Sequence, residues 1–385
     1  MRREGAIRVL HVISGLKAHG AEMMLYKLLC SMDRTRFDPV VMSLGVADTL
    51  RDRIESLGIP VRRLGMSSRR PYHLPLLTMR RIARDIAPDV IQGWMYHGNV
   101  FANLMRRLSP GNPAVLWNVR HSVYDIGQEK PLMRQLIRFG ARLSSGVDAV
   151  IYNSKLSAKQ HEAMGYCAAK TRHLPNGFDT SVFMPSDTAR SHLRAKLKLA
   201  ENTMLVGVVG RFHPMKDHAN FFKAAGLVKA RYQDAQFICI GQGLSVDNPN
   251  VHQLVAEEGL EADVHLLGEQ DDIATAMAAL DVLCSSSWSE SFPNVLGEAM
   301  ACGVPCVATD VGDCSSMLGG LGEIVPARDA SALAKGIVRL LDLGDEARKA
   351  LGMQARQRVI DHFSLAAIAG QHESLYLEIC AKRST

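Results

Sequence analysis

The stretch that most constrains this chain runs from Leu283 to Gly312 and reads LCSSSWSESFPNVLGEAMACGVPCVATDVG. An apolar run that ends in three serines predicts a short strand, and a tight loop follows it. We expect Pro293 to be the first residue of a helix, because the missing N–H of proline would have no partner at that position. Gly303 and Pro305 are typical of a helix end, and the apolar run after them predicts a second buried strand. The order is therefore strand, loop, helix, strand.

This order places the start of a helix beside a loop that carries polar residues. The first turn of a helix leaves N–H groups unpaired, and the helix dipole adds partial positive charge there. Anions and sugar oxygens bind at such places. Glu290 lies in the loop and Glu298 lies more than one turn inside the helix, and carboxylates are good acceptors for sugar hydroxyls. The alternative is that both glutamates are simply solvated.

The segment from Glu290 to Glu298, ESFPNVLGE, resembles the E-x7-E signature of the retaining glycosyltransferases of family 4, which have the GT-B fold. This large family includes bacterial polysaccharide and lipid glycosyltransferases. The resemblance implies that Glu290 holds the donor sugar and that Glu298 holds the ribose of the nucleotide. It also implies that the backbone between them contacts the sugar and the diphosphate, at Phe292, Pro293, Asn294, Val295 and Leu296.

The rest of the chain alternates buried strands with helices. Its 385 residues and 47% hydrophobic content suffice for two cores. Alternation of this kind predicts α/β domains with parallel sheets. The expected strands cover residues 7–13, 40–44, 90–94, 114–119, 149–153, 203–209, 235–241, 264–268, 283–287 and 304–309. With the resemblance, this predicts two Rossmann-like domains that face a central cleft.

The domain boundary is expected where the family has a Pro-Asn-Gly-x-Asp segment, and Pro175 to Asp179 match it. We therefore expect an acceptor-binding domain over residues 1–180 and a nucleotide-sugar-binding domain over 181–363. The resemblance implies that the C-terminal helix, residues 364–385, returns to the first domain. No apolar run is long enough to span a membrane, and no signal peptide is evident. The eight cysteines form no C-x-x-C pair, which favours reduced thiols in a cytoplasmic protein.

Two cations follow the first strand of the second domain. Arg211 and Lys216 lie five residues apart in GRFHPMKD, where a helix start would disfavour positive charge unless an anion is bound. An arginine fork fits phosphate oxygens and lysine supplies a point charge. The arrangement resembles the phosphate clamp of the family. In the first domain, Gly20 belongs to a loop that resembles the family's glycine-rich first loop, although His19 replaces one glycine.

Two histidines follow strands of the first domain. His121 comes after the strand at 114–119 and His97 after the strand at 90–94, and α/β sheets bind ligands at that edge. The resemblance implies that His121 lies on the acceptor side, near the donor sugar. There an imidazole can contact a hydroxyl or the developing phosphate charge. For His97 a structural role is the alternative.

The charge of the chain is uneven. Residues 1–180 contain 27 basic and 14 acidic residues, which leaves 18 basic and 25 acidic residues in the remainder. Basic residues concentrate at Arg62, Arg63, Arg69, Arg70, Arg80, Arg81 and Arg84. Apolar residues lie among them, at Leu74, Leu76, Leu77 and Ile82. This pattern predicts a basic amphipathic helix that anionic lipid would attract, or an ordinary solvated face. Nucleic acid is not expected as a partner, because no nucleic-acid-binding motif occurs.

Together with these observations, the resemblance to family 4 implies a retaining glycosyltransferase. It would move a hexosyl or N-acetylhexosaminyl group from a nucleoside diphosphate sugar, such as a UDP-sugar, to a hydroxyl of a glycan or lipid-linked acceptor. The expected setting is cell-surface polysaccharide or lipopolysaccharide synthesis at the inner face of the membrane. No D-x-D triplet occurs, so we expect no metal or other cofactor. Two alternatives remain, a nucleotide-sugar 2-epimerase on the same fold and a non-catalytic protein that binds nucleotide sugars.

Overall fold

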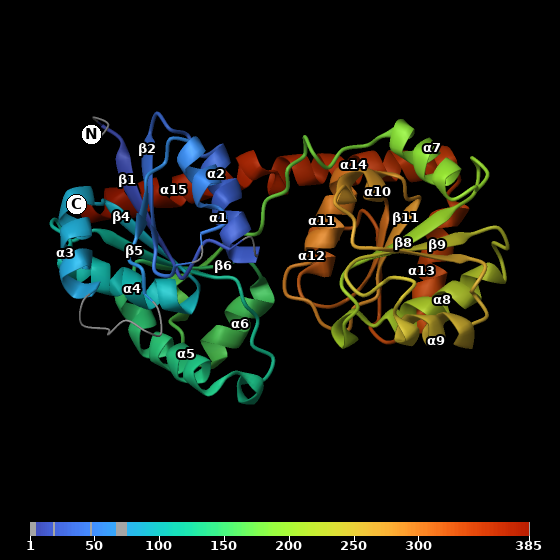
Figure 1. The fold of residues 1–385 in the computed structure, drawn as a ribbon, viewed down its shortest axis with the longest axis horizontal. Helices are drawn as coiled ribbons and strands as arrows, with labels where there is room; N and C mark the ends of the chain where they lie inside the picture. The colour runs from blue at the N-terminus through green and yellow to red at the C-terminus, as the bar shows by residue number, and fades with distance from the viewer. Residues whose placement is uncertain (1–4, 18–19, 47, 67–74, 385) are drawn as a thin grey trace. The chain divides into compact units, whose positions relative to one another are not determined.

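The computed structural model of this protein describes residues 5–17, 20–46, 48–66 and 75–384. Its contacts divide the chain into two units (Figure 1). The first unit consists of Met1–Gly177 and Leu365–Thr385, and the second consists of Phe178–Ser364. The chain first passes from one unit to the other after Gly177, three residues before the boundary expected from the sequence. The last helix, α15 (Leu365–Ser384), belongs to the first unit.

The first unit is built on a parallel sheet of seven strands in the order β3-β2-β1-β4-β5-β6-β7. In that order the strands are Val61–Arg63, Phe37–Ser43, Ile7–Ile13, Val90–Trp94, Ala114–Val119, Ala149–Tyr152 and Thr171–His173. The strand order reverses between β1 and β4, and doubly wound sheets bind ligands beyond the strand ends at such a point. Register pairs Ile13 with Trp94 and Trp94 with Asn118, so these three strands end together.

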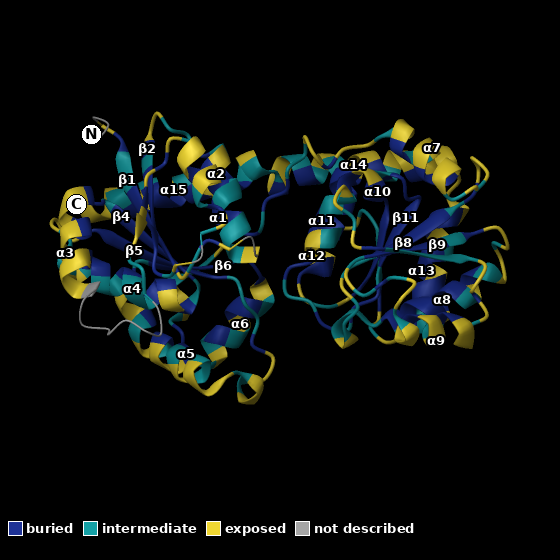
Figure 2. Ribbon diagram, in the orientation of Figure 1, coloured by how far each residue is buried: buried dark blue, intermediate teal, exposed yellow. Residues whose placement is uncertain are grey.

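Helices cover both faces of the first sheet. One apolar cluster joins the sheet to α1 (Gly20–Ser31), α2 (Arg51–Ser56) and α15. A second cluster on the other face joins it to α3 (Pro75–Ile86), α4 (Met95–Leu108), α5 (Pro131–Leu143) and α6 (Lys155–Ala163). The inner strands β2, β1, β4, β5 and β6 are therefore largely buried on both sides, as the dark blue colour in Figure 2 shows. Short 3-10 turns occupy Ile126–Gln128, Ser144–Gly146 and Ala168–Lys170.

The second unit repeats this plan with a parallel sheet of six strands in the order β10-β9-β8-β11-β12-β13. In that order the strands are Val264–Gly268, Gln236–Ile240, Leu205–Val209, Val282–Ser285, Cys306–Thr309 and Glu323–Val325. The order reverses between β8 and β11. Val208 pairs with Cys284, and Cys284 pairs with Val307. The loops that follow β8 and β11 therefore leave the sheet side by side.

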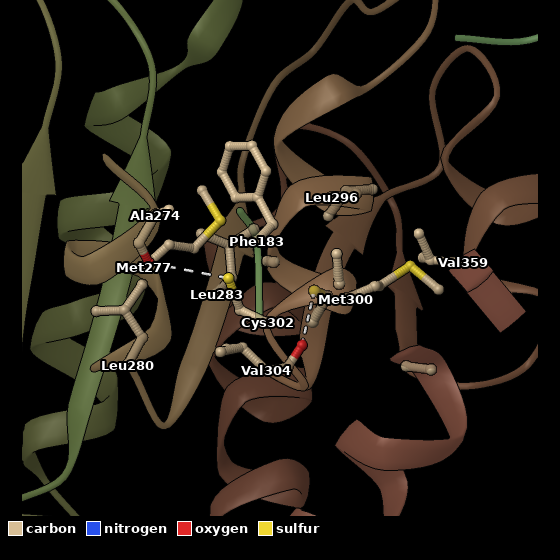
Figure 3. Packing of buried hydrophobic residues seen from close by; sticks show 14 of the residues in the cluster. Phe183, Ala274, Met277, Leu280, Leu283, Leu296, Met300, Cys302, Val304 and Val359 are labelled. Atoms are coloured by element: carbon tan, nitrogen blue, oxygen red, sulfur yellow. Dashed lines mark hydrogen bonds between the residues drawn. The ribbon is translucent and has the colours of Figure 1, made fainter. Parts of the chain in front are cut away.

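Two groups of helices cover the second sheet. One face packs against α8 (His218–Lys229), α9 (Pro249–Glu257) and α13 (Ala330–Asp342). The other packs against α7 (Asp187–Lys196), α10 (Ile273–Ala278), α11 (Asn294–Ala301), α12 (Cys314–Leu318) and α14 (Asp345–Phe363). Figure 3 shows Leu296 and Met300 of α11 in this second cluster, with Leu283 of β11 and Val359 of α14. These contacts fix the helix whose start faces the candidate site.

The predicted α/β class with two parallel sheets is confirmed. The strands expected at 7–13, 90–94, 114–119 and 264–268 have the expected bounds. Three strands were not expected from the sequence: β3, β7 and β13. Each is three residues long and lies at the edge of its sheet. Such short edge strands carry too few residues to show an alternating or a continuous apolar pattern.

The basic region of the first unit differs from the expectation in part. Arg62 and Arg63 lie on β3 rather than on a helix, and Arg63 pairs with Asp48. The amphipathic helix is α3, which carries Arg80, Arg81 and Arg84. Arg69, Arg70 and Leu74 lie outside the described residues, as does His19. None of the helices in the described part of the chain combines the length and apolarity of a membrane span.

Candidate functional site

The start of α11 faces the loop that follows β11. Its first helical residue is Asn294, with Pro293 as the N-cap residue, so the sequence placed the helix start one residue early. The Asn294 amide donates to the carbonyl of Phe292 at 3.0 Å, and the Leu296 amide donates to that of Pro293 at 3.1 Å. These bonds tighten the turn before the helix. Phe292 and Pro293 are themselves buried, so the tip of α11 is anchored in the core.

An ion pair joins the loops after β8 and β11. Lys216 Nζ lies 2.5 Å from Glu290 Oε1. The hydroxyl of Ser287 donates to the same carboxylate oxygen at 2.7 Å. The side chains are only partly accessible, with exposed fractions of 27% for Lys216 and 14% for Glu290. A half-buried pair with a third polar group holds the Glu290 carboxylate in one place.

Three hydrogen bonds hold the two loops together besides the ion pair. Ser286 Oγ donates to the carbonyl of Lys216 at 2.8 Å. The Trp288 amide donates to the carbonyl of Met215 at 3.0 Å, and its indole Nε1 donates to that of Pro214 at 2.8 Å. Ser286 and Trp288, which precede Glu290, therefore hold the backbone at Lys216 in position.

A cavity of about 150 Å³ opens at this point. Lys216, Glu290, the three serines at 285–287 and the segment 292–295 line it, together with the ends of β8 and β11. It lies where the strand order reverses, which is the expected place for a ligand in such a sheet. The lining combines one cation, one carboxylate, hydroxyls and a helix start. Such a set suits a ligand that carries both anionic oxygens and hydroxyl groups.

Three of the site residues expected in the second unit lie outside this lining, namely Arg211, Leu296 and Glu298. Leu296 is fully buried in the apolar cluster behind the helix start. Arg211 is exposed on the loop after β8, whose neighbouring Phe212 amide is bonded to the carbonyl of Gln242 at 2.7 Å. Glu298 is half-buried on α11. The structure therefore brings Lys216, Glu290 and the 292–295 segment together, and it leaves Arg211, Leu296 and Glu298 outside the cavity.

Gly312, which follows β12, lies against the backbone of the loop that carries Glu290. A Cβ atom on Gly312 would lie 2.3 Å from the carbonyl oxygen of Glu290 and 2.7 Å from that of Ser291. The residue also has a φ of +56°, which favours glycine. The Asp313 amide donates to the carbonyl of Ser291 at 3.1 Å. The close approach explains why glycine is needed there, and sequence reasoning did not assign it this role.

In the first unit, the expected residues lie beyond the ends of β1, β4 and β5. His121 has a side-chain exposure of 37%, with Nε2 3.5 Å from a carboxylate oxygen of Glu129. His97 is exposed on α4. Gly20 is the first residue of α1, and a Cβ there would meet no described atom within 4 Å. Close packing therefore does not explain glycine at that position.

The described residues contain no group of three or more histidine, cysteine or acidic side chains arranged to hold a metal ion. All eight cysteines are free thiols. Five of them are buried, namely Cys239, Cys284, Cys302, Cys306 and Cys314. Burial raises the pKa of the Cys302 and Cys314 thiols to about 12, so these groups stay protonated at neutral pH.

With this geometry established, comparison with known proteins defines the class. Residues 18–182 match the model of glycosyltransferase family 4, and residues 203–343 match that of glycosyl transferases group 1. The chain belongs to this glycosyltransferase family and has its GT-B fold. The family resemblance expected from the ESFPNVLGE segment is thereby confirmed.

Particular relatives lie at moderate distance. The chain is 29% identical over 251 residues to N-acetyl-alpha-D-glucosaminyl L-malate synthase of Bacillus anthracis. It is 30% identical over 271 residues to a D-inositol 3-phosphate glycosyltransferase of Corynebacterium jeikeium. These matches cover 65% and 67% of this chain, and 64% of each relative. A crystal structure of Anabaena HepE in complex with UDP is similar in fold, with a TM-score of 0.81 and 22% identity over 97% of this chain and 100% of that one.

Proposed function

We propose that this protein transfers a hexosyl or N-acetylhexosaminyl group from a nucleoside diphosphate sugar to a hydroxyl of a glycan or lipid-linked acceptor, with retention of configuration. The observation that carries the proposal is the Lys216–Glu290 pair in a cavity at the tip of α11. The family membership agrees with it. The names of two relatives supply the sugar chemistry, since one is a glucosaminyl malate synthase and one is an inositol phosphate glycosyltransferase.

The site residues would act mainly by charge and position. Lys216 and the start of α11 face the diphosphate, and Glu290 accepts a hydrogen bond from a sugar hydroxyl. Negative charge grows on the diphosphate as the glycosidic bond breaks, so a cation already in place stabilises the transition state more than the ground state. Arg211 is exposed on the same loop as Lys216 and supplies a second cation to the diphosphate. Glu298 binds the ribose.

Retention would follow from attack on the same face that the diphosphate leaves. In this course the leaving phosphate oxygen takes the proton of the acceptor hydroxyl, and the protein supplies orientation. His121 of the first unit would contact the acceptor or the donor sugar. In this proposal the reaction requires no metal ion, because Lys216 and the start of α11 supply the positive charge at the diphosphate.

The first unit is proposed to bind an anionic lipid surface, where the enzyme encounters its acceptor. Two helices of the first unit combine exposed cations with exposed apolar side chains. On α3 these are Arg80, Arg81 and Arg84 with Leu76 and Leu77, and on α5 they are Arg138 and Arg142 with Leu132 and Phe139. Each basic residue near an anionic surface contributes about 1 kcal/mol. Sedimentation with anionic vesicles at low salt tests this, and the double variant Arg138→Glu and Arg142→Glu should bind less. Equal sedimentation with neutral vesicles contradicts it.

A thermal-shift screen against UDP-, GDP-, ADP- and dTDP-sugars tests the donor part of the proposal and finds the base. Incubation of the stabilising donor with and without glycan or lipid-linked acceptors then separates the alternatives. A transferase gives a glycosylated acceptor whose anomeric proton retains the donor configuration. Conversion of the donor sugar to its 2-epimer without acceptor would instead identify an epimerase. Binding without any turnover would identify a non-catalytic member.

A further inference from the structure

Side chains of helix α6 form hydrogen bonds with the backbone of the loop that carries His121. The hydroxyl of Ser157 donates to the carbonyl of His121 at 2.6 Å. The side-chain oxygen of Gln160 accepts from the amide of Val123 at 2.9 Å. Both α6 residues lie within one turn of His161, and Ser157 and His161 are fully buried. The loop therefore has a fixed path past the end of β5.

A chain of hydrogen bonds leads from the same helix to the ring of His121. His161 Nδ1 lies 2.8 Å from the carbonyl oxygen of Ser157. His161 Nε2 lies 2.8 Å from the hydroxyl of Tyr96. The same hydroxyl lies 3.2 Å from His121 Nδ1. Three elements, α6, α4 and the loop after β5, thus meet in one line of polar atoms.

The direction of each bond follows from the Ser157 carbonyl, which only accepts. His161 Nδ1 must therefore carry its hydrogen. Burial lowers the pKa of His161 to about 4, so the ring is neutral at physiological pH and its Nε2 is an acceptor. Burial raises the pKa of Tyr96, so its hydroxyl keeps its proton and donates it to His161 Nε2. The Tyr96 oxygen then offers His121 only lone pairs.

We propose that Tyr96 and His161 are positioning residues that hold His121 in the tautomer with hydrogen on Nδ1. A lone pair on Tyr96 can be bonded only by an Nδ1–H, so the exchangeable site of His121 is Nε2. That nitrogen lies 3.5 Å from a carboxylate oxygen of Glu129, and 37% of the His121 side chain is exposed. In the neutral ring, Nε2 accepts a hydrogen bond from a substrate hydroxyl, and this last step rests on the proposed function. When the ring is charged, the second proton sits on Nε2 beside the Glu129 carboxylate.

The packing keeps this chain rigid. The rings of Tyr96 and His161 stack with centroids 5.8 Å apart and an interplanar angle of 29°. Tyr166 contacts His161 edge-on at 5.0 Å. Met95, directly before Tyr96, has a φ of +60°, an uncommon conformation for a non-glycine residue, of the kind that clusters at functional sites. A ring held this firmly determines which nitrogen its neighbour must protonate.

The test reads the tautomer directly. Two-bond proton–nitrogen spectra of protein labelled with ¹⁵N-histidine distinguish Nδ1–H from Nε2–H, and a His121→Gln variant assigns the signals. In the neutral ring, wild-type His121 should be protonated on Nδ1. Tyr96→Phe should move the hydrogen mainly to Nε2. His161→Leu should do the same, because the Tyr96 hydroxyl is then free to donate to His121.

Tyr152→Phe is the matched control. Tyr152 is a buried tyrosine whose ring lies 5.4 Å from His161, and its hydroxyl has no partner among the described residues. This variant should leave the tautomer unchanged. An Nε2–H tautomer in the wild type overturns the proposal, and so does an Nδ1–H tautomer that persists in Tyr96→Phe and His161→Leu.

An activity assay separates this inference from the proposed function. Tyr96→Phe should lower kcat by about tenfold or more, because His121 then orients the substrate hydroxyl less well, with an unchanged KM for the donor. If the wild type transfers no sugar yet shows the Nδ1–H tautomer, the proposed function fails and the positioning role stands. If transfer occurs but the wild-type tautomer is Nε2–H, the positioning role fails alone.

Discussion

Lys216 Nζ and Glu290 Oε1 lie 2.5 Å apart, although 74 residues separate them along the chain. The loops that carry them leave β8 and β11, the two strands at which the order of the second sheet reverses. Topology therefore brings this pair together, and the Ser287 hydroxyl holds the same carboxylate oxygen at 2.7 Å. Without a ligand, Lys216 is therefore paired with the Glu290 carboxylate, at the place where a diphosphate is proposed to bind.

Glu290→Gln should preserve the size of the side chain and remove its charge. Lys216 then loses its ion-pair partner, and a sugar hydroxyl loses a charged acceptor. We expect kcat of transfer to fall by about 100-fold or more, the scale of removing one preorganised polar group. The measurement is steady-state transfer with saturating donor. Glu346→Gln, at an exposed position of α14, is the control, and equal activity of both variants would contradict the role of Glu290.

Gly297→Ala should destabilise the second unit. A Cβ at this position of α11 would lie 2.1 Å from two atoms of the Phe178 ring, which stacks on Phe292 with centroids 6.2 Å apart. Overpacking of this kind costs about 1–3 kcal/mol. Gly370→Ala is the matched control on α15, because nothing lies within 4 Å of its Cβ, and alanine there should stabilise by about 0.5–1 kcal/mol. Urea unfolding measures both, and destabilisations of equal size would be inconsistent with the packing.

Stability should fall as the pH decreases below about 6.5. Burial lowers the pKa of His11 and His372 to about 3, and that of His161 and His218 to about 4. Below the ordinary histidine pKa of 6.5, the unfolded chain binds these protons and the folded protein does not. The free energy of unfolding therefore decreases by up to about 1.4 kcal/mol per pH unit for each such histidine, until the folded pKa is reached.

Urea midpoints between pH 7.5 and pH 5 measure this dependence. His372→Leu removes one of the four groups, so its slope should be shallower than that of the wild type. A midpoint that does not change over this range would show that these histidines are not buried in the neutral form.

Transfer should continue in excess EDTA. In the proposed function, Lys216, Arg211 and the start of α11 supply the positive charge at the diphosphate, so we expect that no divalent ion is required for that purpose. Initial rates with and without chelator, after dialysis against EDTA, measure this directly. A loss of activity that manganese restores would contradict the expectation.

The features predicted best from the sequence were those with strong local signals. Long apolar strands such as Val90–Trp94 and Ala114–Val119 are buried on both faces, and continuous apolar runs indicate such strands. The helix start after Glu290 followed from proline and from the spacing of apolar residues. It was misplaced by one residue, because proline is common at the first helical position but is the N-cap residue in this helix.

Features that depend on contacts distant in sequence could not be predicted. Ser287 bonds Glu290, and Gly312 approaches its carbonyl oxygen, but a serine triplet and a glycine after a strand are common in loops. Tyr96 and His161 are 65 residues apart. From the sequence, each of them is predicted only as an ordinary core residue. Their relation to His121 appears only when α4 and α6 pack on the same face of the sheet.

The central claim is that the Lys216–Glu290 cavity binds the diphosphate of a sugar nucleotide. Isothermal titration of the donor selected by thermal shift into the wild type, Lys216→Ala and the control Lys223→Ala, exposed on α8, tests it most directly. Loss of one charge-assisted hydrogen bond is worth about 1.5–3 kcal/mol, so Lys216→Ala should weaken binding by about 10- to 150-fold, while Lys223→Ala binds as the wild type does. Equal affinity of all three proteins, or no binding of any sugar nucleotide by the wild type, would contradict it.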